Sequence, residues 1–115
     1  MKEAQLSMIE RHGLIVNVRP ERRDDYLRLH AAVWPQVEAT ITASNITNYS
    51  IFIAGDTLIA YYEYVGEDHD ADLKLIEADP VTREWWTHTD PCQVAVPGAP
   101  DGTLWFDGTL VWHLD

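Results

Sequence analysis

The residues best suited to chemistry are a tyrosine and a histidine four positions apart. Tyr26 and His30 are followed by Trp34 and Pro35, which gives the pattern Tyr-x-x-x-His-x-x-x-Trp-Pro. Residues four apart on a helix share a face, so we expect the phenol of Tyr26 to lie beside the imidazole of His30. An imidazole titrates near neutral pH and can donate or accept a proton there. The alternative is that His30 is an ordinary core residue on an apolar helix face.

Three other aromatic residues are candidates for contact with a ligand. The chain contains five Trp and five Tyr, and Trp85 and Trp86 are adjacent. Neighbours on a helix point about 100° apart, so one of these tryptophans can pack in the core while the other lines a cavity. Indole faces suit the flat apolar patches of sugars and rings. Tyr49 lies on the apolar face of an expected strand. Simple core packing is the alternative for all three.

Glu63 is a carboxylate within a mostly apolar strand, which makes it a candidate second acid/base group. Burial would raise the pKa of this carboxyl group towards the range useful for acid–base catalysis. The alternative is a solvent-exposed position at the rim of the sheet. The histidines other than His30 show no metal-ligand spacing, and no glycine-rich phosphate loop, nucleophile elbow or zinc motif is present. We therefore expect no metal and no cofactor.

A helix with a break must position His30. Residues 13–18 are β-branched and apolar and predict a strand, and Pro20 opens the helix that follows. Pro35 cannot continue that helix, because its ring clashes with the carbonyl group four residues earlier. We expect a break between His30 and Pro35. His30 would then lie near a helix C-terminus, where the negative end of the helix dipole favours the protonated imidazole.

A hairpin is expected next, formed by strands at residues 46–53 and 58–65 with a short turn between them. Alternation places Tyr49 on the same face as Ile51 and Ile53. Both faces of the second strand are largely apolar, whereas a sheet covered by one layer of helices needs only one apolar face. We therefore expect a partner subunit or a ligand to cover the second face.

A second helical segment and a last strand are expected in the rest of the chain. Residues 70–88 predict a helix in two pieces split by Pro80, with Asp79 as a cap, and residues 108–114 predict a last strand. The order predicts an α+β domain of the ferredoxin-like βαββαβ type, with an antiparallel sheet and helices on one face. We expect one domain over residues 1–115, a flexible leader at residues 1–8, and a homodimer that packs sheet against sheet.

Composition excludes several classes of partner. Nineteen acidic against eight basic residues give a net charge of −11 and disfavour nucleic acid and anionic membrane surfaces. Cys92 is the only cysteine, so an internal disulfide cannot form, and a lone thiol suits a reducing compartment. No segment approaches the roughly 20 apolar residues of a membrane helix, and the first residues predict no signal peptide. We expect a cytoplasmic protein that acts on a small, uncharged molecule.

Several segments in register resemble the L-rhamnose mutarotase family. The run Tyr-Leu-Arg-Leu-His-Ala-Ala-Val-Trp-Pro at residues 26–35 resembles the family signature. Residues 46–52, residues 58–63 and the pair Trp85-Trp86 follow at compatible spacing. The similarity runs from about residue 13 to residue 86.

The resemblance implies a small dimeric protein of the ferredoxin-like, dimeric α/β-barrel type that acts without a cofactor. Members of the family are isomerases that interconvert the α and β anomers of a pyranose, typically L-rhamnose. By the resemblance His30 matches the proton donor. The resemblance leaves the role of Glu63 open between a second acid/base group and a hydroxyl-binding group. The sugar-binding positions of the family correspond to Tyr26, Tyr49, Trp85 and Trp86.

Two departures from the family pattern leave the sugar open. Gln36 stands where members usually carry Glu, and residues 87–92 differ from the usual continuation. L-rhamnose is the expected substrate, and L-fucose or a related deoxy sugar is the alternative. The same fold also hosts cofactor-free monooxygenases, so a monooxygenase and a non-catalytic dimeric sugar-binding domain are the rival interpretations.

Overall fold

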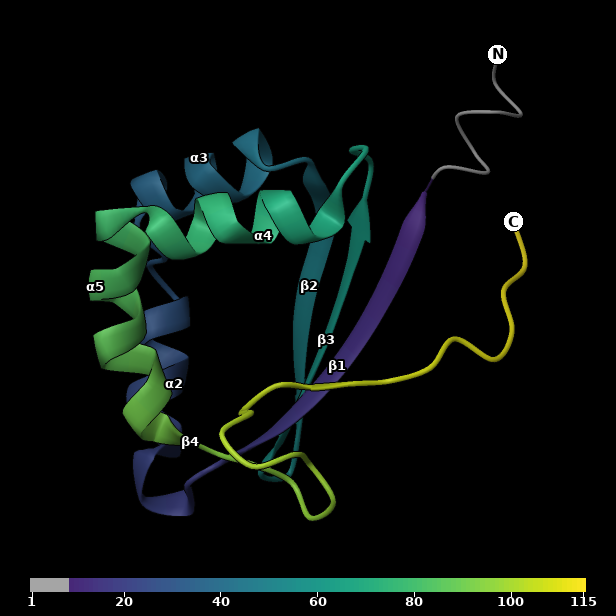
Figure 1. Cartoon of the computed structure of the whole chain (residues 1–115). Coiled ribbons are helices and arrows are strands. Elements are labelled where there is room, and N and C mark those ends of the chain that lie inside the picture. Colours follow the sequence, from purple (N-terminus) through teal and green to yellow (C-terminus); the bar gives the residue numbers. More distant parts are fainter. Residues whose placement is uncertain (1–8) are drawn as a thin grey trace.

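The computed structural model describes residues 9–115 as one antiparallel sheet with helices on one face (Figure 1). The predicted leader, residues 1–8, lies outside the described residues. The elements in chain order are β1 (Glu10–Val18), η1 (Pro20–Arg22), α2 (Arg23–His30), α3 (Pro35–Ala43), β2 (Ile46–Ala54), β3 (Thr57–Tyr64), α4 (His69–Ala78), α5 (Pro80–Thr89), η2 (Asp90–Cys92), β4 (Gln93–Val94) and β5 (Phe106–Asp107).

The strand order confirms the ferredoxin-like prediction. The strands lie in the order β2-β3-β1-β4, and β5 also pairs with β1. All pairs are antiparallel, and β1 and β3 pair over most of their length. The two long crossovers, α2 with α3 and α4 with α5, lie on the same side of the sheet (Figure 1). One face of the sheet is therefore covered by helices, as expected.

The core lies between that covered face and the helices. Burial alternates along β3, where Leu58, Ala60, Tyr62 and Tyr64 are buried and the residues between them are more exposed. Side chains on a strand alternate between the two faces, so this pattern identifies the face that packs against the helices. Val16 contributes to the core from β1. Burying each large aliphatic side chain stabilises the fold by roughly 1.5–3 kcal/mol.

Prolines divide both crossovers as predicted. Helix α2 ends at His30, Trp34 is extended at ψ 131°, and Pro35 is the first residue of α3. Pro80 begins α5 in the same way, and the carboxylate of Asp79 caps that helix by accepting a 2.9 Å hydrogen bond from the backbone N–H of Thr82. Among the described residues, no helix is long and apolar enough to cross a membrane.

The prediction of a last strand at residues 108–114 is wrong. Strand pairing in this part of the chain is limited to Phe106 and Asp107, and the residues that follow have no regular structure (Figure 1). Two contacts still tie them to β1: the N–H of Gly108 donates to the carbonyl of Gly13 at 2.7 Å, and Asp115 lies 3.6 Å from the guanidinium of Arg11. The segment has the apolar, β-branched composition of a strand, but a strand also needs an edge with which to pair. Within the described residues this segment finds no such partner, so Val111 and Trp112 are largely exposed.

Candidate active site

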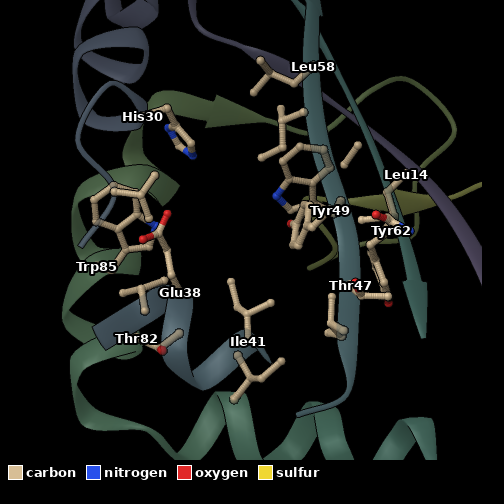
Figure 2. Close-up of a pocket in the computed structure, with 18 of the residues that line it drawn as sticks. Leu14, His30, Glu38, Ile41, Thr47, Tyr49, Leu58, Tyr62, Thr82 and Trp85 are labelled. Atoms are coloured by element: carbon tan, nitrogen blue, oxygen red, sulfur yellow. The ribbon is translucent and has the colours of Figure 1, made fainter. Parts of the chain in front are cut away.

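A large cavity lies between the helices and the covered face of the sheet (Figure 2). Its volume is about 1050 Å³, at the upper end of the roughly 300–1,000 Å³ typical of small-molecule sites. The structure brings five of the six predicted site residues together here, because the break between α2 and α3 directs the end of α2 towards α5 and the hairpin. The five are Tyr26, His30, Tyr49, Trp85 and Trp86.

His30 is the last residue of α2, and its ring points into the cavity (Figure 2). Its Nδ1 lies 3.1 Å from the backbone carbonyl oxygen of Tyr26. A carbonyl oxygen only accepts, so Nδ1 carries the hydrogen, and in the neutral ring Nε2 holds the lone pair. The ring stacks on that of Tyr26 with centroids 4.2 Å apart, which confirms that the phenol and imidazole lie side by side. This contact and this hydrogen bond hold the imidazole in one orientation.

The expected protonated state of His30 is wrong. Burial lowers the pKa of His30 below its usual value of 6.5, and the hydrogen bond to the carbonyl of Tyr26 opposes that shift without reversing it. At neutral pH His30 is uncharged, and its free Nε2 can accept a proton.

Tryptophans form one wall of the site. Trp85 is buried and meets the ring of His30 edge-on, with centroids 5.4 Å apart. Trp34, which the sequence interpretation left without a role, supports Trp85 through a second edge-on contact at 5.2 Å. Trp86 lines the cavity and also packs against a cluster of buried residues from β2, β3 and α4. The pair thus combines packing and lining roles, as its helical spacing predicts.

A β-bulge directs Tyr49 into the cavity. The pairing of β2 with β3 shifts by one residue between Thr47 and Ser50, and Asn48 adopts a left-handed φ of 50° there. An extra residue reverses the alternation of side chains, so Tyr49 faces the cavity, whereas an unbroken strand starting at Ile46 would turn it outwards. Although 43% of the surface of Tyr49 is exposed, desolvation of its hydroxyl group raises its pKa.

Glu63 lies outside the cavity, which contradicts its predicted role as a second acid/base group. It alternates with Tyr62 and Tyr64 on β3, so it faces the side of the sheet away from the helices. Its carboxylate accepts hydrogen bonds from Asn48 Nδ2 at 2.9 Å and from the hydroxyl of Tyr61 at 2.8 Å. These two bonds lower the pKa of Glu63. Glu63 therefore holds the bulge that directs Tyr49, from the opposite face.

Among the polar residues that line the cavity, four with titratable side chains were missed by the sequence interpretation. Glu38 belongs to the first turn of α3, and its carboxylate lies on the same side of the cavity as His30 and Trp85 (Figure 2). Alternation along β3 places Tyr62 on the same face as Leu58 and Ala60, which was the available signal for it. Nothing in the local sequence pattern indicates the other two. The four are Glu38, Tyr62, His69 and Asp107.

Comparison with known proteins identifies the family. The family model for L-rhamnose mutarotase matches residues 11–114. An L-rhamnose mutarotase from Oceanobacillus iheyensis is 31% identical over 93% of this chain and 100% of its own length. One from Listeria monocytogenes serotype 4b is 32% identical over 77% of this chain and 85% of its own. The chain belongs to the L-rhamnose mutarotase family. It is therefore a member of a family of isomerase-type enzymes, as the sequence motifs indicated.

Solved structures agree on the fold. The crystal structure of an L-rhamnose mutarotase from Formosa agariphila superposes with a TM-score of 0.71 at 19% identity, over 92% of this chain and 99% of that chain. The tetracenomycin F2 cyclase of Streptomyces glaucescens, a type-II polyketide cyclase, superposes with a TM-score of 0.63 at 11% identity, with the same coverage of both chains. The ferredoxin-like fold therefore occurs both in the mutarotase family and in a cyclase with an unrelated activity, so the fold alone does not establish the reaction.

Proposed function

We propose that this member of the L-rhamnose mutarotase family interconverts the α and β anomers of a deoxyhexose pyranose, with L-rhamnose as the first candidate. The observation that carries the proposal is the protonation and the position of His30. A neutral imidazole with a free Nε2 is held by Tyr26 and Trp85 at the wall of a cavity large enough for a sugar. Mutarotation requires only proton transfers, which one such group can perform.

His30 transfers a single proton between two oxygens in this proposal. Nε2 takes the proton of the anomeric hydroxyl, the bond between the anomeric carbon and the ring oxygen breaks, and the imidazolium gives the proton to the ring oxygen. Both oxygens are bonded to the same carbon, so one nitrogen can reach each in turn. Rotation about the bond between the first two carbons of the open-chain aldehyde, followed by the reverse steps, forms the other anomer. His30 is thus the proton donor to the ring oxygen.

Glu38 stabilises the charged intermediate state of His30. In the free protein Glu38 is exposed, and the pKa of His30 is set by burial and by the Tyr26 carbonyl. Once a bound sugar displaces water from the cavity, this carboxylate on the same side as His30 favours the imidazolium over the neutral ring through Coulomb attraction. The attraction matters only after His30 has taken the proton, so it lowers the energy of the state through which the reaction passes.

The aromatic residues bind and orient the sugar. Burial raises the pKa of Tyr26, and the nearby Tyr49 raises it further, so both phenols keep their protons at neutral pH and can donate hydrogen bonds to sugar hydroxyls. The indoles of Trp85 and Trp86 present apolar surface to the C–H face of the ring and to the methyl group of a deoxy sugar. Few cationic groups line the cavity, which suits a neutral sugar.

We further propose that the protein works as a homodimer. The C-terminal segment carries four exposed apolar side chains without a pairing strand in the described part of the chain: Leu110, Val111, Trp112 and Leu114. Phe52 and Ile59 are also exposed on the outer face of the sheet. A second copy that pairs with this segment and covers that face would bury both surfaces. Light scattering should give twice the chain mass, and a monomer at micromolar concentration would contradict this proposal.

Saturation-transfer NMR tests the activity directly. Irradiating the α-anomeric proton of L-rhamnose should reduce the β signal in the presence of the protein, at a rate that grows with protein concentration. A parallel series with L-fucose and D-glucose would define the preference for the sugar. If the protein accelerates exchange of none of these sugars beyond the rate in buffer, the proposed function is wrong.

A further inference from the structure

Two histidines that are far apart in the sequence meet beside Tyr62, which lines the cavity. His12 lies on β1 directly opposite Tyr62 of β3, and His69 is the first residue of α4. The rings of His12 and His69 stack with centroids 4.2 Å apart. The carboxylate of Glu10, two residues before His12 on the same strand face, completes the group.

We propose that Glu10, His12 and His69 form a binding site for a divalent transition-metal ion of the zinc type. One potential ligand atom of each residue lies within 4.8 Å of those of the other two. His12 Nε2 and Glu10 Oε1 are already 3.2 Å apart. Ligands bound at zinc-like distances of about 2.0–2.1 Å lie roughly 3.3 Å from one another in a tetrahedron. Side-chain rotations of Glu10 and His12 that close the remaining gap to His69 by up to about 1.5 Å would complete a three-ligand set.

The donor set determines which ions fit. Two imidazole nitrogens and one carboxylate oxygen suit zinc, cobalt and nickel, whereas calcium and magnesium prefer oxygen ligands. The surroundings also attract cations. The chain carries a net charge of −11, and Asp107 lines the cavity together with Tyr62 and His69.

Tyr62 forms a hydrogen bond to His69 of the kind that orients metal-bound histidines. Its hydroxyl lies 2.7 Å from Nε2 of His69, and its ring stacks on that of His12 with centroids 4.8 Å apart. A fixed partner on one ring nitrogen orients the imidazole for metal binding through the other.

The site would leave a coordination position towards the cavity. His69, Tyr62 and Asp107 all line the cavity, so an ion held by the three ligands would be open to water or to a sugar hydroxyl. His30 stacks on Tyr26, which belongs to a different cluster of core residues from Tyr62. Metal binding is therefore a property separate from the proton transfer proposed for His30, and it can be measured whether or not the sugar is turned over.

Titration of the tag-free, full-length protein with Zn²⁺ and Co²⁺ tests the proposal. Calorimetry should show one ion per chain with micromolar affinity, and Co²⁺ should give the visible absorption bands of a site with few ligands. His12→Ala and His69→Ala should each weaken Zn²⁺ binding at least about 30-fold, and Glu10→Gln about 10-fold. Mg²⁺ should not compete. Circular dichroism should show that each variant remains folded, and Glu10→Gln, at an exposed position, provides the least disruptive test.

His113→Ala is the matched control. His113 also lies next to a carboxylate, with Nε2 2.6 Å from Asp115 Oδ1, but within residues 9–115 it belongs to no group of three potential metal ligands. This variant should bind Zn²⁺ as the wild type does. The proposal is overturned if the wild type shows no saturable binding below about 1 mM, if the three ligand variants bind as tightly as the wild type, or if His113→Ala loses as much affinity as His12→Ala.

Discussion

Replacing His30 with glutamine removes the nitrogen that carries the proton while it preserves the local contact. The amide N–H of glutamine can donate to the carbonyl of Tyr26, as Nδ1 of His30 does now. The glutamine side chain does not titrate, so it cannot take a proton from one oxygen and return it to another. A general acid–base group contributes roughly 10²–10⁴-fold to rate. We expect His30→Gln to reduce catalysed anomer exchange by about that factor.

Loss of stability cannot account for a decrease of that size. His30 stacks on Tyr26 and meets Trp85 edge-on, and each aromatic contact contributes about 0.5–1.5 kcal/mol. The substitution therefore costs about 1–3 kcal/mol. For 115 residues each kcal/mol corresponds to about 4 °C, so Tm should fall by about 4–12 °C. A domain with an unfolding free energy of only about 5 kcal/mol would still be more than about 95% folded at 25 °C.

The assay compares exchange of L-rhamnose anomers by saturation-transfer NMR with a thermal melt of the same sample. His88→Gln is the matched control, because His88 makes an edge-on contact with Trp34 at 5.6 Å but lies outside the main cavity. It should keep the wild-type rate. If folded His30→Gln retains exchange within about tenfold of the wild type, His30 is not the proton-transfer group, and the reasoning from its free Nε2 fails.

Four other outcomes follow from the same structure. The kcat/KM of the wild type should fall in acid with a midpoint below pH 6.5, because the pKa of His30 is lowered and the neutral ring is the reactive form; a midpoint above 6.5 would contradict this. Glu38→Gln should lower kcat about tenfold with little change in KM, whereas a change in KM alone would assign Glu38 to binding. Glu63→Leu should raise KM, because it loosens the bulge that directs Tyr49 into the cavity. Glu63→Gln keeps a hydrogen-bond acceptor and should have a KM close to that of the wild type. Equal effects of the two variants would refute this positioning role. Leu58→Ala, at a position 1% exposed, should lower the unfolding free energy by about 2–5 kcal/mol in denaturant titrations, and a loss below about 1 kcal/mol would show that the core is loosely packed there.

Local rules made much of the fold predictable. The proline break after His30, the cap at Asp79, and the two alternating strands of the hairpin depend on a few neighbouring residues each. The geometry of the backbone restricts these residues in the same way in any protein. The pairing of Tyr26 with His30 is predictable for the same reason, since helical spacing alone places their rings together.

The outward position of Glu63 follows from alternation on β3, yet its function required the structure. The sequence shows a carboxylate in an apolar strand, which suggested an acid/base group. The contact that gives Glu63 its role is its hydrogen bond to Asn48, which lies on another strand. Asn48 sits at the bulge that changes which face of the sheet Tyr49 occupies. A one-residue change of register depends on how two strands pair, and the sequence of one strand does not contain that information.

The sequence by itself therefore determined the family, the order of elements and the principal site residues, because these depend on motifs and on local periodicity. Only the tertiary structure decided three other properties. Burial lowers the pKa of His30 against the effect of its hydrogen bond to the Tyr26 carbonyl, His12 and His69 meet across the fold, and residues 108–114 find no strand with which to pair within residues 9–115. Each depends on what surrounds a residue in space, and solvent exclusion and strand pairing arise only when distant parts of the chain come together.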